Sequence, residues 1–456
     1  MNTRLVWALA LVVAMLACLA CPVGRADAPA GGTDPALPGV DFVDQLAKGD
    51  FAGAEGKLDA TMKGALPEEK LGATWKALVK QAGAFQKRLR ARVTEQAGYK
   101  IVLVTCQFEK TALDAKVVFN GKGEVAGLFF VPAAPEGGFK TPAYAQADAY
   151  TEKEVTVGKG EWALPGTLTM PKGAKGKVAA VVLVQGSGPN DRDETVGANK
   201  PFRDLAWGLA TRGIAVLRYE KRTRQYAAKL GAGSLAGFTV KEETIDDALA
   251  ATEALRGTEG IDRQRIFVVG HSLGAMVAPR IGQADPHLAG LILMAAPARP
   301  FEDLLVEQTR YLLTLGGPLA QEDEAKVAAM TADAAKIKKL AAADAGSATL
   351  IQGAPPSYWL DLRAHDPIAI AKTLQQPMLI LQGGRDYQVT ADDFENWKKG
   401  LGAAPTVTYR MYPKLNHLFS AGSGKSRPSE YEVAGNVDES VVRDTADWIE
   451  KTPPAP

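Results

Sequence analysis

Residues 266–279 read IFVVGHSLGAMVAP, and this stretch decides the fold. Its first four residues are apolar without interruption, as in a parallel strand that is covered on both faces of a sheet. The run ends in Gly-x-Ser-x-Gly, with Ser272 at its centre. Between a strand and a helix, this pattern predicts a nucleophile elbow, a strained turn that exposes a serine hydroxyl and needs small neighbours. The alternative is an ordinary turn in which the hydroxyl of Ser272 caps the helix by accepting a backbone N–H.

The chain has 456 residues, a formal net charge of +1 and a charged fraction of 23%. A single hydrophobic core stops growing at about 250–300 residues, so we expect at least two domains. Charges of both signs are mixed along the chain, unlike the basic footprint of proteins that bind nucleic acid or an anionic membrane. We therefore expect a small or neutral partner and no nucleic acid.

Residues 1–28 are typical of an export signal. Arg4 precedes the apolar stretch Leu5–Ala20, and small residues follow around Arg25. This layout predicts cleavage near the end of the segment and a secreted or periplasmic protein. The apolar stretch is slightly shorter than the roughly 18 residues of a membrane span, so we expect no integral span in the mature protein.

The chain contains three cysteines. Cys18 and Cys21 lie within the predicted signal, where lipidation of one of them, as in a lipoprotein, is an alternative to removal of both. After cleavage only Cys106 is left, so we expect no intrachain disulfide. This cysteine lies in an apolar run and is expected to be buried in a core.

A Pro- and Gly-rich linker at 29–39 precedes a predicted domain at 40–133. In that domain, apolar residues at helical spacing give way to alternating strands, which indicates a small α+β module. It resembles the curved-sheet domains of nuclear-transport-factor-like folds. Its aromatic residues form either a ligand pocket or, as is commoner at such spacings, part of the core: Trp75, Phe85, Phe129 and Phe130.

A second linker at 134–146 leads into a predicted domain at 147–452. After an initial hairpin, apolar strands alternate with helical segments, which predicts a mostly parallel, doubly wound sheet with helices on both faces. Ligands of such sheets bind at the carboxyl ends of the strands, which is where Ser272 falls. Residues 301–368 are largely helical and interrupt the alternation, so we expect them to form a cap over these strand ends.

Two further polar residues follow buried strands. Asp386 comes on the loop after the strand that begins near Met378, and His417 comes on the loop after the last strand. The order Ser, Asp, His in this topology is that of an α/β-hydrolase triad, in which a histidine takes the proton of the serine and an acid orients the histidine.

Three other histidines compete for the role of the base: His271, His287 and His365. None of them follows the last strand, and His271 belongs to the elbow itself, where its side chain is expected to point away from a reacting carbonyl. Aspartates on the next helix compete with Asp386 for the role of the acid, but Asp386 lies closer to the end of its strand.

A carbonyl under attack also needs hydrogen-bond donors for its developing negative charge. The segment 185–189, QGSGP, ends a buried strand, and the N–H of Ser187, or of Gly188, can point into the site. The N–H of Leu273, directly after the nucleophile, is the second expected donor. No glycine-rich pattern of a nucleotide-binding loop follows, so we do not expect a bound phosphate.

Several segments between about Glu154 and Ile449 resemble the secreted bacterial α/β-hydrolases of the esterase type, some of which carry a small α+β domain in front. This group is related to dienelactone hydrolases and to prolyl-oligopeptidase-like hydrolases. The segments are GSGPNDRDE, LATRGIAVLRYEKRT, VVGHSLGAMVAPRI, LILMAAPARP, LILQGGRDYQV and YPKLNHLF. The resemblance implies Ser272 as the nucleophile, His417 as the base and Asp386 as the residue that orients it.

Together these patterns predict a serine carboxylic-ester hydrolase that acts on small, aromatic or acetyl esters through an acyl-enzyme, with no metal and no cofactor. Tyr358 and Trp359 near the end of the cap either line the substrate pocket or pack the cap. One alternative is a serine aminopeptidase or thioesterase on the same fold, although no charged cluster predicts a site for an amine or coenzyme A. The other is a binding protein on a degenerate hydrolase fold, which the complete triad disfavours. The sequence does not predict an oligomeric state.

Overall fold

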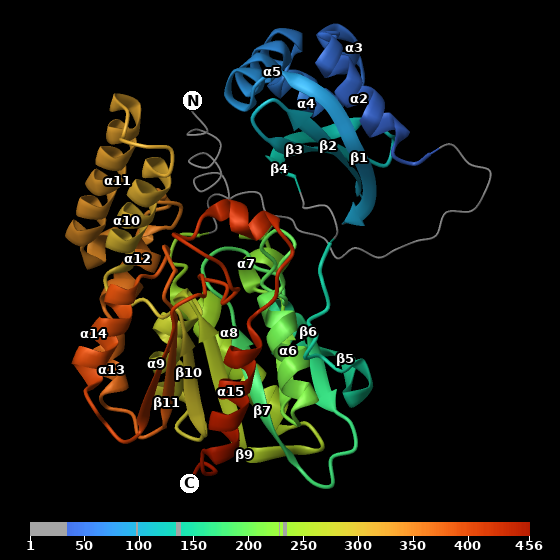
Figure 1. Ribbon diagram of the computed structural model, residues 1–456. Coiled ribbons are helices and arrows are strands. Elements are labelled where there is room, and N and C mark those ends of the chain that lie inside the picture. The colour runs from blue at the N-terminus through green and yellow to red at the C-terminus, as the bar shows by residue number, and fades with distance from the viewer. Residues whose placement is uncertain (1–33, 97–98, 134–137, 228, 231–234) are drawn as a thin grey trace. The chain divides into compact units, whose positions relative to one another are not determined.

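The computed structural model describes residues 34–456 except 97–98, 134–137, 228 and 231–234, and the chain divides after Glu136 into two units (Figure 1). The predicted export signal and its two cysteines lie outside the described residues. In the part of the chain that the structure describes, no helix is long and apolar enough to cross a membrane.

The first unit begins with helices and ends with a sheet. Its helices are α2 (Leu37–Lys48), α3 (Phe51–Gly56), α4 (Ala60–Ala65) and α5 (Glu68–Ala82). Its strands are β1 (Phe85–Gln96), β2 (Tyr99–Phe108), β3 (Ala112–Phe119) and β4 (Val125–Pro132). The strands form an antiparallel sheet in chain order. This arrangement confirms the predicted α+β class.

The aromatic residues of this unit form a core. Trp75 is 7% exposed, and its ring contacts those of Phe85, Phe108 and Phe130 at centroid distances of 5.8–6.0 Å. Phe129 is 44% exposed and does not join them. Cys106 is buried as a free thiol, and burial raises its pKa to about 12. Of the two interpretations of these aromatics, the structure supports core packing.

The second unit is built on an eight-stranded sheet in the order β12-β11-β10-β9-β7-β8-β6-β5. The strands are β5 (Tyr150–Val157), β6 (Leu164–Pro171), β7 (Val178–Val184), β8 (Ala215–Tyr219), β9 (Ile261–His271), β10 (Gly290–Met294), β11 (Met378–Gly383) and β12 (Val407–Tyr412). β5 and β6 form the predicted antiparallel hairpin at one edge. From β8 to β12 all pairings are parallel, so the doubly wound sheet is confirmed.

Helices cover both faces of this sheet (Figure 1). The helices that pack on it are α6 (Pro201–Thr211), α8 (Asp246–Arg256), α9 (Leu273–Ala284), α14 (Ala391–Leu401) and α15 (Glu439–Lys451). α6 packs against α15, and α8 packs against α9. Shorter elements are η1 (Ala147–Ala149), η2 (Gly160–Trp162), α7 (Arg222–Gln225), the π-helical turn η3 (Lys241–Ile245) and η5 (Pro428–Glu432).

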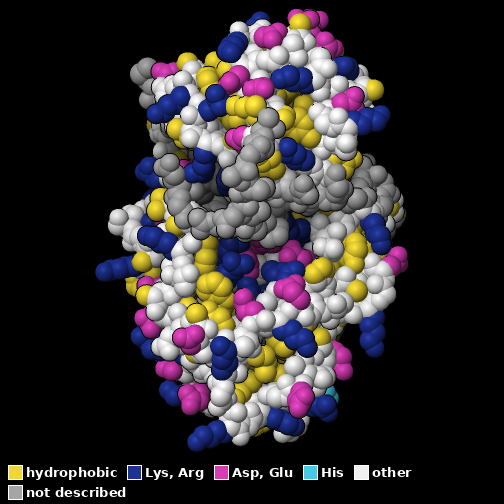
Figure 2. All heavy atoms as spheres, turned by 90° about the vertical axis from the view of Figure 1, so that its right-hand side faces the viewer, with side chains coloured by type: hydrophobic (Ala, Val, Ile, Leu, Met, Phe, Trp, Pro, Cys, Tyr) yellow, Lys and Arg dark blue, Asp and Glu magenta, His cyan; other side chains and the backbone are white. Residues whose placement is uncertain are grey.

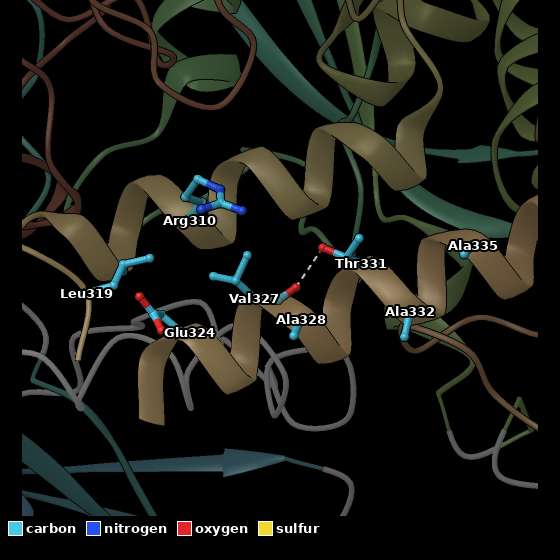
Figure 3. A pocket seen from close by; sticks show the side chains of 8 residues that line it. All are labelled: Arg310, Leu319, Glu324, Val327, Ala328, Thr331, Ala332 and Ala335. Atoms are coloured by element: carbon cyan, nitrogen blue, oxygen red, sulfur yellow. Dashed lines mark hydrogen bonds between the residues drawn. The ribbon is translucent and has the colours of Figure 1, made fainter. Parts of the chain in front are cut away.

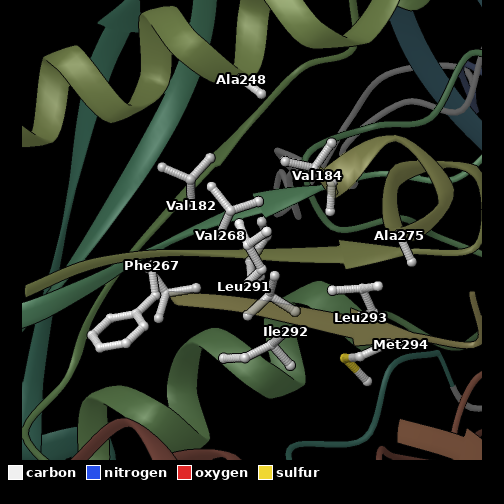
Figure 4. Packing of buried hydrophobic residues seen from close by; sticks show 14 of the residues in the cluster. Val182, Val184, Ala248, Phe267, Val268, Ala275, Leu291, Ile292, Leu293 and Met294 are labelled. Carbon is white, nitrogen blue, oxygen red and sulfur yellow. The ribbon is translucent and has the colours of Figure 1, made fainter. Parts of the chain in front are cut away.

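Uninterrupted apolar strands place the core at the centre of the sheet. Figure 4 shows Val182, Val268 and Ile292 from three adjacent strands, and all three are fully buried. Strands covered on both faces need apolar residues at every position, which is why the sequence runs without alternation here. The carboxyl ends of these strands are therefore held by a rigid, dry scaffold.

The segment predicted as a cap lies between β10 and β11. It consists of α10 (Phe301–Thr314), α11 (Gln321–Lys339), η4 (Ala342–Gly346), α12 (Pro356–Arg363) and α13 (Pro367–Ala371). α10 and α11 pack against each other as a helical hairpin (Figure 1).

Part of the predicted second linker is packed against the second unit. The hydroxyl of Tyr144 donates to the carbonyl of Val437 at 2.7 Å, and the ring of Phe139 lies edge-on against Trp207. Residues 138–146 are thus anchored to this unit rather than free of it.

The surface of the second unit carries charges of both signs. In the view of Figure 2, Lys and Arg side chains are interspersed with Asp and Glu side chains. This surface agrees with the mixed charge of the sequence.

Candidate active site

Ser272 lies in a strained turn between β9 and α9. Its φ of 53° and ψ of −119° fall in a region that non-glycine residues rarely adopt, at a cost of about 1–3 kcal/mol. The N–H of Ser272 donates to the carbonyl of Met294 at 2.9 Å, which ties the turn to the end of β10. The segment has the backbone geometry of the predicted nucleophile elbow, and the serine side chain makes no helix-capping hydrogen bond.

The two glycines of the motif are required by backbone contacts. A Cβ atom on Gly270 would lie 2.3 Å from the carbonyl oxygen of Gly274, and one on Gly274 would lie 2.3 Å from that of Val184. Neither position has room for a side chain, because the obstacle in each case is main chain. This explains the Gly-x-Ser-x-Gly pattern physically.

Asp386 and His417 form a buried pair. Oδ2 of Asp386 lies 2.7 Å from Nδ1 of His417, and their side chains are 0% and 6% exposed. The other carboxylate oxygen accepts the N–H groups of Gln388 and Val389 at 2.7 and 3.0 Å. A carboxylate next to Nδ1 requires a proton there, which leaves the lone pair of Nε2 free to accept a proton.

Glycines also allow the two loops of this pair to meet. A Cβ on Gly383 would lie 2.5 Å from the carbonyl oxygen of Asn416, and one on Gly384 would lie 2.8 Å from the Cα of Pro413. The side chain of Asn416 accepts the N–H of Leu418 at 3.0 Å and so folds the histidine loop on itself. The close approach of the loops sets the distance between acid and base.

His271 connects the base to the elbow. Its Nε2 lies 2.9 Å from the backbone carbonyl oxygen of His417, and the two imidazole rings are 4.6 Å apart between centroids. His271 directly precedes Ser272, so this contact places the loop of the base beside the elbow. Among the described residues no hydrogen bond joins Ser272 to His417, and such contacts are often long before substrate binds.

The loop after β7 lies against the serine. A Cβ on Gly186 would come within 3.1 Å of the Cβ of Ser272. Ser187 is exposed, and within the described part of the chain its N–H has no acceptor. Leu273 is the first residue of α9, so its N–H has no partner inside the helix. Ser187 follows Gly186, which lies against Ser272, and Leu273 directly follows Ser272. Within the described residues, both N–H groups are thus available as candidate donors.

Comparisons with known proteins identify the family. Esterase EstD of Thermotoga maritima is 39% identical to this chain over 410 residues, which is 90% of this chain and 94% of that protein. The chain belongs to the EstD family of α/β-hydrolase esterases. A family described as serine aminopeptidase, S33, matches residues 197–421, and a protein family of unknown function, DUF3887, matches residues 40–128.

Solved structures are similar to this EstD-family esterase at lower identity. The acylaminoacyl peptidase of Pyrococcus horikoshii is 15% identical, with a TM-score of 0.45, over 80% of this chain and 56% of that chain. Est1E of Butyrivibrio proteoclasticus is 14% identical, with a TM-score of 0.42, over 65% of this chain and 99% of that chain.

Glu194 is a buried residue of this candidate site that the sequence interpretation missed. Its φ is 51°, and its Oε1 accepts the N–H of Gly186 at 2.6 Å. Its Oε2 lies 2.9 Å from Nδ1 of His271 but off the line of a well-formed hydrogen bond, so this contact is chiefly electrostatic. The acidic cluster in GSGPNDRDE was the available signal, but sequence alone does not show which of its carboxylates turns inward.

Acceptors face both ring nitrogens of His271: the carboxylate of Glu194 and the carbonyl of His417. The doubly protonated ring donates from Nε2 to the carbonyl of His417 and places a positive charge next to the Glu194 carboxylate. Burial of the ring opposes this charge, yet Glu194 and the His417 carbonyl raise the pKa of His271 above its ordinary value. The expectation that this side chain points away from a reacting carbonyl did not include its contact with the backbone of His417.

The other charged residues of the segment 186–194 anchor the loop after β7. Arg192 contacts Glu154 and Glu220 at 2.6 and 2.8 Å. Asp193 is paired with cations on three sides: Lys200, Arg203 and Arg218. Burial opposes ionisation of Asp193, but these cations hold its pKa below its ordinary value. These ion pairs fix the segment that carries Glu194.

The remaining histidines lie apart from the triad. His287 is exposed, and its backbone N–H donates to Asp285. Nδ1 of His365 lies 2.7 Å from the carbonyl oxygen of Asp361 within the cap. Among the residues that the structure describes, no cluster of His, Cys, Asp and Glu side chains is arranged to hold a metal ion.

The two predicted substrate contacts are buried in the cap. The hydroxyl of Tyr358 donates to Glu243 at 2.6 Å, and the indole of Trp359 donates to the carbonyl of Ile351 at 2.7 Å. Trp359 is 1% exposed and belongs to the main core. Their role in substrate binding stays a prediction, and in this structure both side chains pack the cap.

Two hollows border the cap. One of about 480 Å³ lies between α10 and the acid loop, and its lining includes Arg310, Tyr311, Asp386 and Tyr387. The other, of about 530 Å³, lies along α10 and α11 and is lined by Arg310, Val327 and mostly small residues (Figure 3). Only the first touches a residue of the predicted triad.

Proposed function

We propose that this esterase cleaves carboxylic esters through an acyl-enzyme formed on Ser272. The observation that carries the proposal is the strained Ser272 turn beside a buried Asp386–His417 pair. Strain of this kind persists only where the surrounding structure imposes it, and it is common at reacting groups. All three residues follow the carboxyl ends of parallel strands, namely β9, β11 and β12, which is the edge where doubly wound sheets bind their ligands.

In this mechanism, Oγ of Ser272 attacks the ester carbonyl carbon while its proton passes to Nε2 of His417. The N–H groups of Ser187 and Leu273 donate to the carbonyl oxygen as it becomes negative, and each such donor contributes about 3–4 kcal/mol to stabilising the transition state. His417 then gives the proton to the leaving alcohol. Asp386 keeps the imidazole in the required tautomer and stabilises its charged form.

A water molecule completes the cycle. It loses a proton to His417 and attacks the acyl carbonyl carbon, and the bond to Oγ of Ser272 then breaks as the serine regains its proton. The products are the acid and the free enzyme. No step of this scheme requires a metal or an organic cofactor.

Small, acetyl or aromatic esters are the proposed substrates. An apolar cluster joins the cap to the loops of the acid and the base through Leu312, Tyr387, Leu418 and Tyr431. The ring of Tyr311 on the cap stacks on Tyr387, next to Asp386, with centroids 4.9 Å apart. This cluster gives the region beside Asp386 an apolar character, which supports esters with apolar groups as substrates.

Peptidase activity is the second candidate, because the matched family is described as serine aminopeptidase. An aminopeptidase needs an acidic group for the substrate amine, and the sequence shows no obvious acidic cluster that would supply one. A panel of p-nitrophenyl esters from acetate to decanoate, tested beside aminoacyl p-nitroanilides, separates the candidates. We expect hydrolysis of the short esters; cleavage of the anilides alone would favour the peptidase.

Replacement of the nucleophile tests the mechanism directly. We expect Ser272→Ala to lower kcat for p-nitrophenyl acetate by about 10⁴-fold or more, because the hydroxyl forms the covalent bond. Alanine is small enough for the elbow, so the far-UV circular dichroism should match that of the wild type. Near wild-type turnover by the folded variant would exclude Ser272 as the nucleophile.

We also propose export to the periplasm or the medium, on the basis of the charged, apolar and small-residue order at 1–28. Expression of the full chain in a bacterium, followed by fractionation and sequencing of the mature N-terminus, tests this. A cytosolic protein that retains Met1 would contradict it, and a lipid on Cys18 or Cys21 would indicate the lipoprotein route.

A further inference from the structure

Lys221 is a buried cation beside the proposed oxyanion hole. It follows β8 and is 1% exposed. Its Nζ donates to the carbonyl oxygen of Gly186 at 2.6 Å and lies 3.4 Å from Glu243. Its backbone N–H donates to the carbonyl of Asn190 on the same loop. Burial of an ammonium group is costly unless the group is well paired, and an apolar side chain could fill the same space without that cost.

The carbonyl that Lys221 holds belongs to the peptide that carries the predicted donor. In a planar trans peptide, C=O and N–H point in opposite directions. The C=O of Gly186 points to buried Lys221, and the N–H of the same peptide belongs to exposed Ser187. The lysine therefore turns this N–H away from the interior, on a loop that lies against Ser272.

The preceding peptide is fixed separately. The N–H of Gly186 donates to Glu194, so it is not available to a substrate. The side-chain amide of Asn190 donates to the carbonyl oxygens of Gly186 and Ser187 at 3.1 and 3.0 Å. These contacts hold the loop, but of the described side chains that donate to the Gly186 carbonyl, Lys221 is the one with a positive charge. A charged donor on a carbonyl polarises the peptide and strengthens the N–H at its other end.

The cap reaches Lys221 through one residue. Glu243 lies in the π-helical turn η3 and accepts the hydroxyl of Tyr358 on α12 at 2.6 Å. Turns of this type occur often at functional sites. A chain of polar contacts thus runs from Tyr358 through Glu243 and Lys221 to the peptide of Ser187.

We propose that Lys221 is a positioning residue of the oxyanion hole, which orients and polarises the Gly186–Ser187 peptide so that the Ser187 N–H binds the negative oxygen of the tetrahedral intermediate. This rests on the proposed function, because it needs Ser272 as the nucleophile. The lysine acts through the peptide and does not touch the substrate.

The test compares Lys221→Met with the wild type on p-nitrophenyl acetate. Loss of a whole oxyanion donor lowers kcat by about 10²–10³-fold, so a weakened donor should cost about 10–100-fold in kcat. KM should stay nearly constant, because the ground-state carbonyl depends little on the donor. Lys229→Met is the matched control: it removes the same charge from an exposed lysine of the same segment and should keep full activity.

A transition-state analogue separates positioning from a general structural effect. A trifluoromethyl ketone adds reversibly to a serine hydroxyl and places an oxyanion at the same donors. Its inhibition constant should rise in Lys221→Met by the same factor as kcat/KM falls. Equal inhibition constants in a folded variant, or a loss confined to thermal stability, would overturn the proposal.

Lys221→Gln serves if the methionine variant does not fold, because glutamine keeps a donor without the charge. It should show the same matched changes in kcat/KM and in the inhibition constant; unchanged values would overturn the proposal. Labelling of wild-type Ser272 by a fluorophosphonate is checked separately. If that label is absent, the proposed function itself fails, whatever the lysine variants show.

Discussion

The fold favours the charged form of His271, although the ring is buried. Because its pKa is raised by Glu194 and the His417 carbonyl, the protonated ring contributes stability that is fully present below about pH 6.5, the ordinary histidine value. That contribution is lost as the pH rises through the raised pKa of the folded state. The contact thus makes the stability of the site dependent on pH.

We expect His271→Gln to remove this dependence, because glutamine has no proton to lose and keeps a donor for the His417 carbonyl. The difference in free energy of unfolding between wild type and variant should be largest below about pH 6.5 and shrink at higher pH. Urea unfolding across a pH series measures this difference in free energy of unfolding. The other titrating groups are present in both proteins, so their contributions cancel. A gap that widens with pH would show that the ring is neutral.

His417 should be the one histidine that activity requires as the base. His417→Ala is expected to lower kcat/KM by about 10³-fold or more, because the Ser272 proton then has no acceptor. His365→Ala and His287→Ala are the matched controls and should stay near the wild type. Steady-state kinetics with p-nitrophenyl acetate decide this, and an enzyme that tolerates the loss of His417 but not of His365 would place the base in the cap.

At the level of elements, close contacts between backbone atoms hold the ends of the strands in place. We expect Gly274→Ala to prevent a native elbow, because its Cβ would lie 2.3 Å from the carbonyl oxygen of Val184. Gly176→Ala is the control, since nothing lies within 4 Å of its Cβ position. Thermal unfolding should show a large loss of stability for the first variant and almost none for the second. Equal melting temperatures would mean that the elbow shifts freely.

The sequence predicts elements well where one rule governs them. Uninterrupted apolar runs identified the central parallel strands, and the Gly-x-Ser-x-Gly motif located the turn at Ser272. The partners of Glu194, His271 and Lys221 could not be predicted, because each depends on which of several polar residues turns inward after distant segments meet. The sequence around Glu243 has no hydrophobic periodicity that distinguishes a π-helical turn from the start of an ordinary α-helix.

For the whole molecule, the two units have separate cores, and all candidate catalytic residues belong to the second. A shortened protein that starts at Gly138 should therefore keep kcat on p-nitrophenyl acetate. One that starts at Ala147 should be less stable by about 1 kcal/mol or more, because it loses the Tyr144 hydrogen bond and the Phe139 contact. Kinetics and urea unfolding of both proteins test this; an inactive but folded Gly138 protein would show that the first unit completes the site.

The order of the strands also bears on how the protein becomes active as it is made. β9 and the serine lie at the middle of the sheet, and β10, β11 and β12 are added in turn on one side. During synthesis the chain emerges from its N-terminus, so the nucleophile is present before the acid, and the acid before the base. A partly made chain thus holds a serine with no proton acceptor, and hydrolysis begins only once the outermost strand and its loop have docked.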